Sequence, residues 1–332
     1  MSHTRTALSR LEEAFVLLAS FWFLGGLYID GWAHNHIKTL ETFFTPWHAA
    51  FYSGYLVLSL ALVIPVLLRK REAGSWSAAI PTAYGWALIG IPLFAVGGLG
   101  DMLWHITFGV EQDIDALLSP THLLLATSLF LMLSGPLRAW WKSAKPVATF
   151  VGQLPMALSA AFMLSLMSFM TQFDHFAVIR AIGSAPLEAW EADMIQSLAI
   201  SGFLFQTALF MGFIFLLLKR SGTAPGVITL IFTVNLLAMA WMRDGLIVLP
   251  AAVLAGAVAD VLAQGLFPLK QHRREARIFA FVVPVLYFFC YFAILLLTST
   301  VWWSVHLWMG SIFIVGIIGL LMSFLALPLA EE

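Results

Sequence analysis

The stretch from Pro46 to Arg71 reads PWHAAFYSGYLVLSLALVIPVLLRKR, a nearly unbroken apolar run that ends in three basic residues. As an α-helix, positions 46–68 are long enough to cross a hydrocarbon core of about 30 Å. The run does not alternate between polar and apolar residues, so it does not resemble a strand of a membrane β-barrel. It therefore predicts one membrane-spanning helix with a basic end outside the hydrocarbon.

Other segments of the chain have the same character. Of the 332 residues, 61% are hydrophobic and only 11% are charged, whereas a soluble domain has roughly 25% charged residues. We therefore expect an all-α, polytopic transmembrane bundle of about ten helices, forming a single integral membrane domain over residues 1–332. The predicted helices cover residues 12–29, 46–68, 77–104, 120–140, 148–171, 193–218, 225–242, 246–266, 278–299 and 304–326.

The basic residues are distributed unequally between alternate loops. With the N-terminus inside, only Lys38, Arg180 and Arg243 lie outside, and the remaining 14 of the 17 basic residues lie inside. The positive-inside rule then predicts that both termini are cytoplasmic. The first apolar run lacks a small-residue cleavage site, so we expect it to be retained in a bacterial cytoplasmic (inner) membrane. The inside residues are Arg5, Arg10, Arg69, Lys70, Arg71, Arg138, Lys142, Lys145, Lys219, Arg220, Lys270, Arg273, Arg274 and Arg277.

Composition also excludes some classes of function. The formal net charge of -1 and the absence of a soluble domain give no reason to expect a nucleic-acid partner, so the lipid bilayer is the expected surrounding. The single cysteine, Cys290, rules out an intrachain disulfide and a thiolate metal cluster. Any chemistry must therefore use other side chains of the bundle or its outer loops.

Two predicted helical hairpins carry the same polar pattern. The first reads DGWAH over residues 30–34 and TPWH over residues 45–48, and the second reads DMLWH over residues 101–105 and SPTH over residues 119–122. Each pattern follows glycines that we interpret as part of a helix end. This self-similarity predicts a duplicated hairpin. The repeat hairpins cover about 12–68 and 77–140, the glycines are Gly25, Gly26, Gly97, Gly98 and Gly100, and residues 141–332 supply the remaining bundle helices.

Each hairpin brings one carboxylate and two imidazoles together. An Asp and a His four residues apart project from one face of a helix. A Ser or Thr N-cap followed by proline places the last histidine in the first turn of the next helix. Such a donor set suits copper, zinc or iron and is ill-suited to calcium or magnesium, and a lone solvated histidine would not repeat in this way. The predicted metal ligands are Asp30, His34 and His48, and Asp101, His105 and His122.

Further polar residues of the same predicted face are weaker candidates. They could complete a coordination sphere or orient an imidazole, although solvated loop charges and interfacial anchoring explain them as well. One carboxylate, Asp260, lies inside a predicted helix, where an interhelical hydrogen bond or a proton relay would account for it. The weaker candidates are His36 and Glu41 in the first loop, Glu111, Asp113 and Asp115 in the second, and His175 and His306 further along the chain.

The second hairpin resembles the copper-binding region in the C subunit of particulate methane and ammonia monooxygenases. The resemblance lies in two short segments, Asp-x-x-Trp-His and Ser-Pro-x-His, and it implies that Asp101, His105 and His122 bind copper and that a small substrate is oxidised. The first hairpin departs from the pattern because Trp32 follows Asp30 by two positions instead of three. The ten-helix length and the duplication also depart from that subunit, and nothing in the chain resembles its partner subunits.

These patterns favour a copper-dependent membrane oxidoreductase that acts on a small or lipid-soluble substrate, with one dinuclear or two mononuclear sites. A transition-metal transporter is an alternative, but it would need ligands at the midplane and on the inner side, where Asp260 is the main polar residue. A zinc-dependent lipid hydrolase and a structural subunit without chemistry are further alternatives. Homo- or hetero-oligomer formation is left open.

Overall fold

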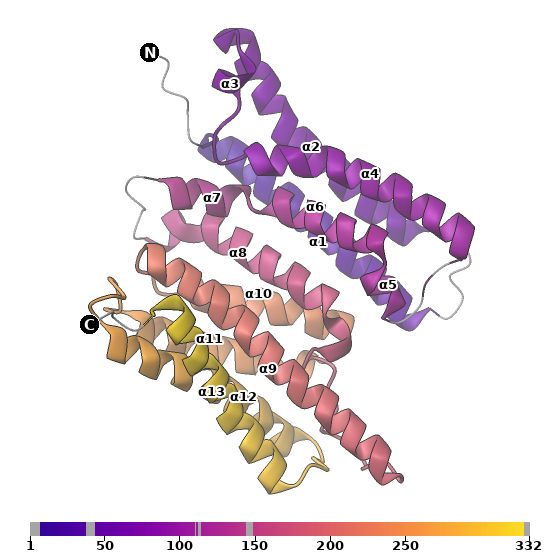
Figure 1. Ribbon diagram of the computed structural model, residues 1–332, viewed down its shortest axis with the longest axis vertical. Helices are drawn as coiled ribbons and strands as arrows, with labels where there is room; N and C mark the ends of the chain where they lie inside the picture. Colours follow the sequence, from indigo (N-terminus) through magenta and orange to yellow (C-terminus); the bar gives the residue numbers. More distant parts are fainter. Residues whose placement is uncertain (1–6, 38–43, 110, 112–113, 144–148, 329–332) are drawn as a thin grey trace. The chain divides into compact units, whose positions relative to one another are not determined.

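The computed structural model describes residues 7–37, 44–109, 111, 114–143 and 149–328 (Figure 1). Helices dominate these residues, which contain one isolated β-bridge, between Ile182 and Val301, and no strand. The prediction of an all-α fold is therefore confirmed. The chain divides into two compact units: unit 1 comprises residues 1–146 and 154–170, and unit 2 comprises residues 147–153 and 171–332.

Unit 1 consists of two packed helix pairs and their connections. The first pair is α1 with α2, the second is α4 with α6, and α2 also contacts α4. The caps follow the sequence: Ser9 and Glu12 form a capping box at the start of α1, and Gly74 ends α2 with a positive φ of 71°. Its helices are α1 (Arg10–His36), α2 (Pro46–Ala73), α3 (Trp76–Ala79), α4 (Gly85–Phe108), α5 (Asp115–Leu118), α6 (Pro120–Leu133), α7 (Gly135–Lys142) and most of α8 (Phe150–Met170).

Unit 2 contains five longer helices that pack side by side. The helix α12 contacts both α11 and α13, α13 contacts α9, and α10 contacts α11. Its elements are the 3₁₀ turns η1 (Gln172–Asp174) and η2 (Leu246–Val248), and the helices α9 (Ala189–Arg220), α10 (Val227–Met242), α11 (Leu249–Ala263), α12 (Arg273–Thr298) and α13 (Val305–Ala326).

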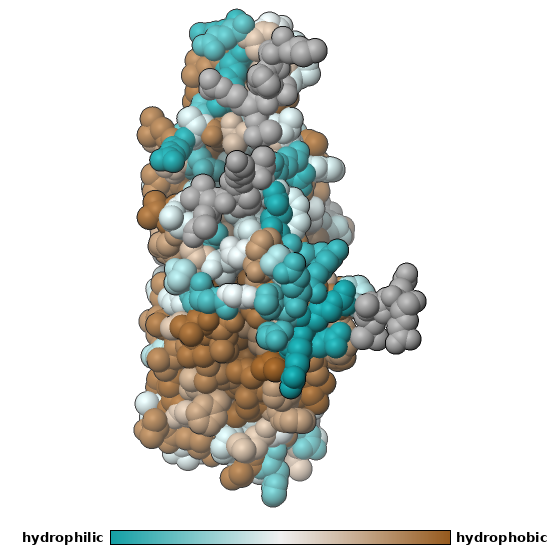
Figure 2. All heavy atoms as spheres, turned by 90° about the vertical axis from the view of Figure 1, so that its left-hand side faces the viewer, coloured by the Kyte–Doolittle hydropathy of each residue, from teal (hydrophilic) through white to brown (hydrophobic). Residues whose placement is uncertain are grey.

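Eight helical segments of the described chain are long and apolar enough to cross a membrane. The predicted span 120–140 is instead two helices, α6 and α7, bent by 42°, and α10 has only 16 residues. The bend falls at Ser134, where Gly135 packs on the Tyr84 ring and Pro136 opens the new helix. Together these account for the ten predicted segments. Much of the surface in Figure 2 is hydrophobic, as expected for a protein surrounded by lipid.

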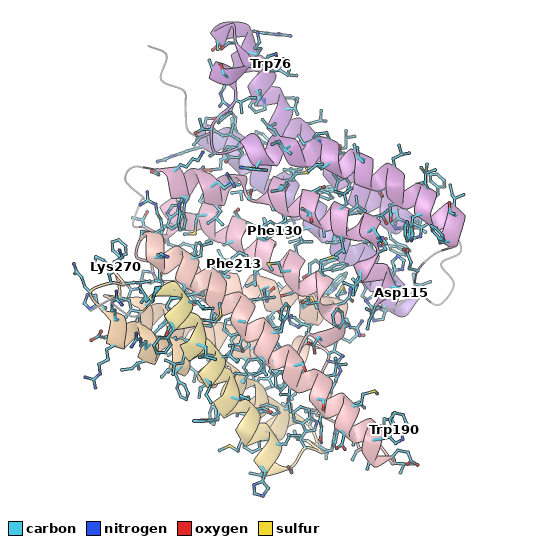
Figure 3. The ribbon with its side chains drawn as sticks, in the orientation of Figure 1. Trp76, Asp115, Phe130, Trp190, Phe213 and Lys270 are labelled. Atoms are coloured by element: carbon cyan, nitrogen blue, oxygen red, sulfur yellow. The ribbon has the colours of Figure 1, made fainter. Side chains whose placement is uncertain are left out.

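The two ends of unit 1 differ in their polar residues. At one end, Glu12 near the start of α1 forms an ion pair with Arg69 near the end of α2. Trp76 lies at this end, whereas Asp115 lies at the opposite end, where α1 and α4 finish (Figure 3). The candidate ligands are on the turns near Asp115, so they lie away from the basic end of the unit.

The glycines before each ligand pattern lie inside helices, and the first helix continues beyond its predicted end at residue 29. Gly26 lies inside α1, which continues to His36, and Gly98 lies inside α4, which continues to Phe108. These glycines serve close helix packing instead, because a Cβ on Gly26 would lie 2.7 Å from the Cα of Phe51 in α2. Small residues at a helix contact let backbones approach closely in a membrane. The spacing between α1 and α2, and hence between their ligands, is therefore set by glycine.

Gly26→Ala should lower the thermal stability of the detergent-solubilised protein, whereas Gly25→Ala should not. The added methyl at Gly26 meets the backbone of α2, and such overpacking typically costs about 1–3 kcal/mol. Gly25 is a matched control in the same turn of α1, because nothing lies within 4 Å of a Cβ built there. A thermal unfolding series on the two variants measures the difference. Equal melting temperatures would contradict the close packing.

Candidate metal centre

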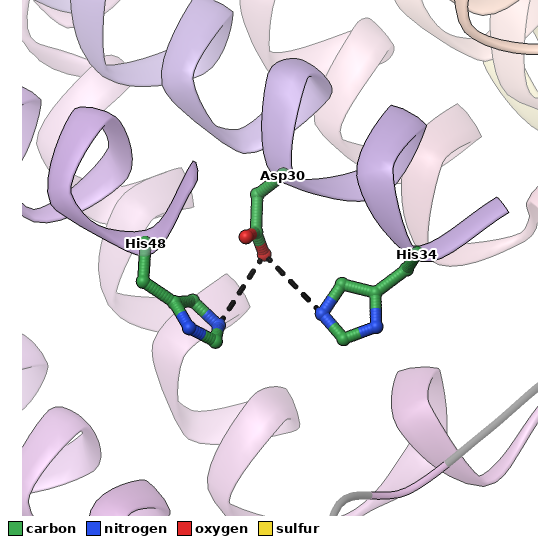
Figure 4. Close-up of side chains that lie close together, drawn as sticks. All are labelled: Asp30, His34 and His48. Atoms are coloured by element: carbon green, nitrogen blue, oxygen red, sulfur yellow. Dashed lines mark ion pairs between the residues drawn. The ribbon is translucent and has the colours of Figure 1, made fainter. Parts of the chain in front are cut away.

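The first predicted ligand set comes together where α1 ends and α2 begins. The Nε2 atom of His34 lies 3.8 Å from Asp30 Oδ2, and Nε2 of His48 lies 3.5 Å from the same oxygen (Figure 4). The donor atoms of these residues all lie within 4.8 Å of one another. We call Asp30, His34 and His48 the Asp30 cluster. In both imidazoles, Nε2 is the nitrogen that faces Asp30 Oδ2.

The second set has the same arrangement where α4 ends and α6 begins. Nε2 of His105 lies 3.6 Å from Asp101 Oδ1, and Nε2 of His122 lies 3.2 Å from that oxygen. Their donor atoms also lie within 4.8 Å of one another. We call Asp101, His105 and His122 the Asp101 cluster. Both predicted triplets are thus brought together, each from one helix pair of unit 1.

Local sequence explains this placement. Asp30 and His34, like Asp101 and His105, are one helical turn apart on a continuous helix, so their side chains share a face. The third ligand of each set sits in a first turn fixed by proline at the helix start and by a side-chain cap. The hydroxyl of Thr45 accepts the His48 backbone N–H at 3.1 Å, and Ser119 accepts that of His122 at 3.4 Å.

Contacts around the Asp101 cluster hold its imidazoles in orientation. Nδ1 of His105 lies 3.2 Å from the Glu111 carboxylate, and Nδ1 of His122 lies 2.7 Å from the Ser119 hydroxyl. Thr121 donates its hydroxyl hydrogen to Asp101 Oδ1 at 3.1 Å. Partners of this kind leave the other imidazole nitrogen free to bind a metal ion, and they are typical of protein metal sites.

The donors fit a transition-metal ion. Ligand bonds of about 2.0–2.2 Å require donor atoms roughly 3.4 Å apart in a tetrahedral site, so rotations of the side chains would close each cluster around one ion. Asp101 is only 2% exposed. Asp30 Oδ1 is buried and accepts no hydrogen bond within the described part of the chain. A buried carboxylate oxygen without a donor is costly unless a cation compensates it.

The two clusters are neighbours. Asp101 and His105 are both among the charged groups that act electrostatically on Asp30. Tyr52 lies on α2, one turn after His48, and carboxylates of both clusters act on its hydroxyl. The hydroxyl reaches the α4 backbone at Gly98, where a Cβ would lie 3.2 Å from the Tyr52 oxygen. The sequence did not single out Tyr52, although its place four residues after His48 puts it on the ligand face.

Among the weaker candidate ligands that lie in the described residues, the structure places only Glu111 beside one of the two clusters. Glu111 contacts His105 as described above, whereas His36 stacks on Trp32 with ring centroids 4.7 Å apart and joins neither cluster. His175 and His306 belong to unit 2 and also join neither cluster. Asp115 is exposed in α5, and Glu41 and Asp113 lie outside the described residues.

Asp260 has a structural role as an interhelical cap. Its carboxylate on α11 accepts hydrogen bonds from the backbone N–H groups of Ile228 and Thr229, each at 3.0 Å, and from the Thr229 hydroxyl at 2.6 Å. These groups open α10, whose N-cap residue Gly226 provides no side-chain cap. The alternative of an interhelical hydrogen bond is therefore confirmed for this residue. The Asp260 carboxylate is hydrogen-bonded to the first turn of α10, so its burial is explained without a transported ion.

Comparisons with known proteins assign no family to the chain. No protein-family model, no curated protein and no solved structure matches the chain. The motif resemblance to copper monooxygenases thus stays a prediction. The chemistry of the site follows from the arrangement of its side chains.

Modification of histidines by diethyl pyrocarbonate should separate His175 from His306. His175 is fully buried in the loop after α8, and burial together with Arg180 lowers its pKa to about 3, so the imidazole stays neutral at pH 6. A neutral imidazole is the reactive form, yet we expect no modification because reagent cannot reach it. His306 is exposed in the first turn of α13 and should react. Peptide mass spectrometry gives both extents, and a reactive His175 would contradict its placement.

Proposed function

We propose that this integral membrane protein is a metalloprotein that binds one transition-metal ion in each cluster. The observation that carries the proposal is the same three-donor arrangement in two helix pairs, each with two Nε2 atoms turned toward one Asp oxygen. Asp101 is buried and Asp30 is mostly shielded from water, so their neighbouring carboxylates repel one another strongly. A bound cation in each cluster removes that cost.

Copper is the favoured ion, and oxidation is the favoured chemistry. Two imidazoles and a carboxylate suit copper, zinc and iron, and the resemblance of the Asp101 cluster to copper monooxygenases selects copper among them. Three protein ligands leave a coordination position for O₂ or substrate. In a monooxygenase reaction, one oxygen atom enters the substrate and the other leaves as water, with two electrons and two protons from an external donor. The apolar helices around the clusters would admit a small or lipid-soluble substrate.

We place the clusters on the non-cytoplasmic side of the membrane, with both termini cytoplasmic. The support is the separation of charge in unit 1, where Arg69, Lys70 and Lys142 lie at one end and the clusters at the other. Basic residues favour the cytoplasmic side. A bacterial inner membrane then gives the clusters access to the periplasm.

Metal analysis of detergent-purified, chelator-free protein tests the proposal. We expect two copper ions per chain in the wild type and a copper(II) signal in electron paramagnetic resonance after oxidation. Asp30→Ala and Asp101→Ala should each lose one ion, because each removes the oxygen that both imidazoles face. Asp115→Ala is the matched control, since this exposed carboxylate lies near the same end of unit 1 and outside both clusters (Figure 3).

The other outcomes discriminate between functions. Two tightly bound zinc ions with no paramagnetic signal would exclude copper oxidation and favour the zinc hydrolase. Vesicle uptake of labelled copper that depends on His48 and His122 would favour a transporter. A protein without stoichiometric metal, unchanged by Asp101→Ala, would refute the metalloprotein itself.

Thr121→Val should weaken metal binding at the Asp101 cluster alone. The substitution keeps the shape of the side chain but removes the hydroxyl that donates to Asp101 Oδ1. Loss of such an orienting contact typically reduces metal affinity about 10- to 100-fold. The control is Thr107→Val, because the Thr107 hydroxyl bonds only to the Leu103 carbonyl on an exposed face of α4. Competitive titration with a chelator measures both affinities, and equal values for the two variants would contradict the orienting role of Thr121.

A further inference from the structure

A groove runs along the start of α12 in unit 2, remote in sequence from the metal clusters. Its volume is about 490 Å³. Its exposed lining is almost entirely apolar, and three arginines contribute to it with the carbon parts of their side chains. The lining residues are Arg273, Arg274, Arg277, Ile278, Phe281 and Val282 of α12, and Leu320 of α13.

The three arginines belong to the first turns of α12 and bring positive charge beside the groove. None of them forms an ion pair with a carboxylate in the described part of the chain, and the nearest acidic neighbour in sequence, Glu275, is exposed. Arg277 lies over the ring of Phe324 on α13, 4.1 Å from its centroid, and its buried Nε has no hydrogen-bond partner among the described residues. Arg273 donates to the Pro328 carbonyl. Arg273 and Arg277 are thus held by these contacts, and no carboxylate of the described residues pairs with them.

The position of these arginines in α12 favours an anion beside them. They occupy the first turns of the helix, where the macrodipole is positive and cations are unfavourable. A negative group in the groove would therefore be attracted both by the guanidinium groups and by the helix end.

The apolar part of the groove continues along the helix toward its middle. Ile278 is 54% exposed, and Phe281 and Val282 are partly exposed one turn further on. Figure 2 shows hydrophilic residues gathered directly beside a hydrophobic area on this side of the protein. A small phosphate ion could pair with the arginines but would leave the apolar part uncovered. The lining matches a molecule with an anionic head and a hydrocarbon tail.

We propose that this groove binds an anionic phospholipid, with the phosphate on Arg273, Arg274 and Arg277 and an acyl chain along Ile278, Phe281 and Val282. Basic pockets between membrane helices recognise anionic head groups through charge-assisted hydrogen bonds. The inference is independent of the metal clusters, because the groove shares no residue with them.

Another basic group, at the end of α2, has different partners. Arg69 is paired with Glu12, and Lys70 donates to the Gly74 carbonyl at 2.7 Å and lies 5.6 Å from the centre of a Trp76 ring. Arg69 is thus paired with a carboxylate of unit 1, whereas no carboxylate of the described residues pairs with the groove arginines. Basic charge outside the groove therefore provides a matched control.

The test compares full-length protein purified in a neutral detergent with added dioleoyl phosphatidylglycerol or dioleoyl phosphatidylcholine. Native mass spectrometry should show one phosphatidylglycerol retained per chain, and phosphatidylcholine retained at least tenfold less. The triple variant Arg273→Gln, Arg274→Gln, Arg277→Gln should lose this preference at least tenfold. The control triple variant Lys70→Gln, Arg71→Gln, Lys219→Gln removes the same charge elsewhere and should keep it. Circular dichroism verifies that both variants remain helical.

Two further measurements test whether the bound phosphate belongs to a lipid and whether the acyl chain contributes to binding. Inorganic phosphate at millimolar concentration should not displace the lipid, and Ile278→Ser, at an exposed position, should weaken retention without changing helix content. Equal retention by both triple variants, equal retention of the two lipids, or displacement by inorganic phosphate would overturn the proposal.

Discussion

An ionised carboxylate within an apolar helix has no water to bond with, and its cost must be offset by protein donors or by a cation. Asp30 and Asp101 lie near the ends of such helices in unit 1, and in both cases two histidine nitrogens lie within 4 Å of one carboxylate oxygen. Asp260 shows the other solution, since three donors from α10 satisfy it completely. The contrast separates a carboxylate bonded to helix backbone from two that lie beside pairs of histidine nitrogens.

That arrangement depends on helices that are close and rigid. Gly26 and Gly54 face the backbones of Phe51 and Phe23, so α1 and α2 pack without intervening side chains. The caps at Thr45 and Ser119 then fix the first turns that carry His48 and His122. Because both ends of each ligand set rest on helices instead of loops, the donor atoms are positioned before any ion arrives.

Hydropathy and charge were sufficient to predict the all-α fold and the order of its apolar segments, because the bilayer imposes a minimum helix length. The same reasoning ended the first helix at residue 29, whereas α1 continues to His36, because hydropathy does not register a helix end that carries polar residues. It also missed the break at Ser134, although Gly135 and Pro136 directly after it are a local signal for a helix break. The spacing of Asp, His and the Pro-capped turn predicted both clusters, because helical periodicity and capping are local. Tyr52 and the donor role of Thr121 depend on which helices meet, and local patterns carry no such information.

The two clusters are alike in their ligands but differ in their surroundings, and the sequence shows why. The position of Thr121, which bonds Asp101, is occupied in the first hairpin by Trp47, which instead packs on Trp32 with centroids 6.2 Å apart. Asp30 therefore lacks the hydroxyl donor that Asp101 has. The side chain of His34 is also 29% exposed, against 5% for His105.

These differences imply different dependence on a bound ion. In the Asp101 cluster the carboxylate and both imidazoles are already oriented by protein groups, so an ion adds affinity to an existing geometry. In the Asp30 cluster, the buried Oδ1 of Asp30 accepts no hydrogen bond from the described residues, and the His34 side chain is partly exposed to solvent. Under the proposed function, the Asp101 cluster would therefore hold its ion more tightly, and the Asp30 cluster would hold the ion that exchanges ligands.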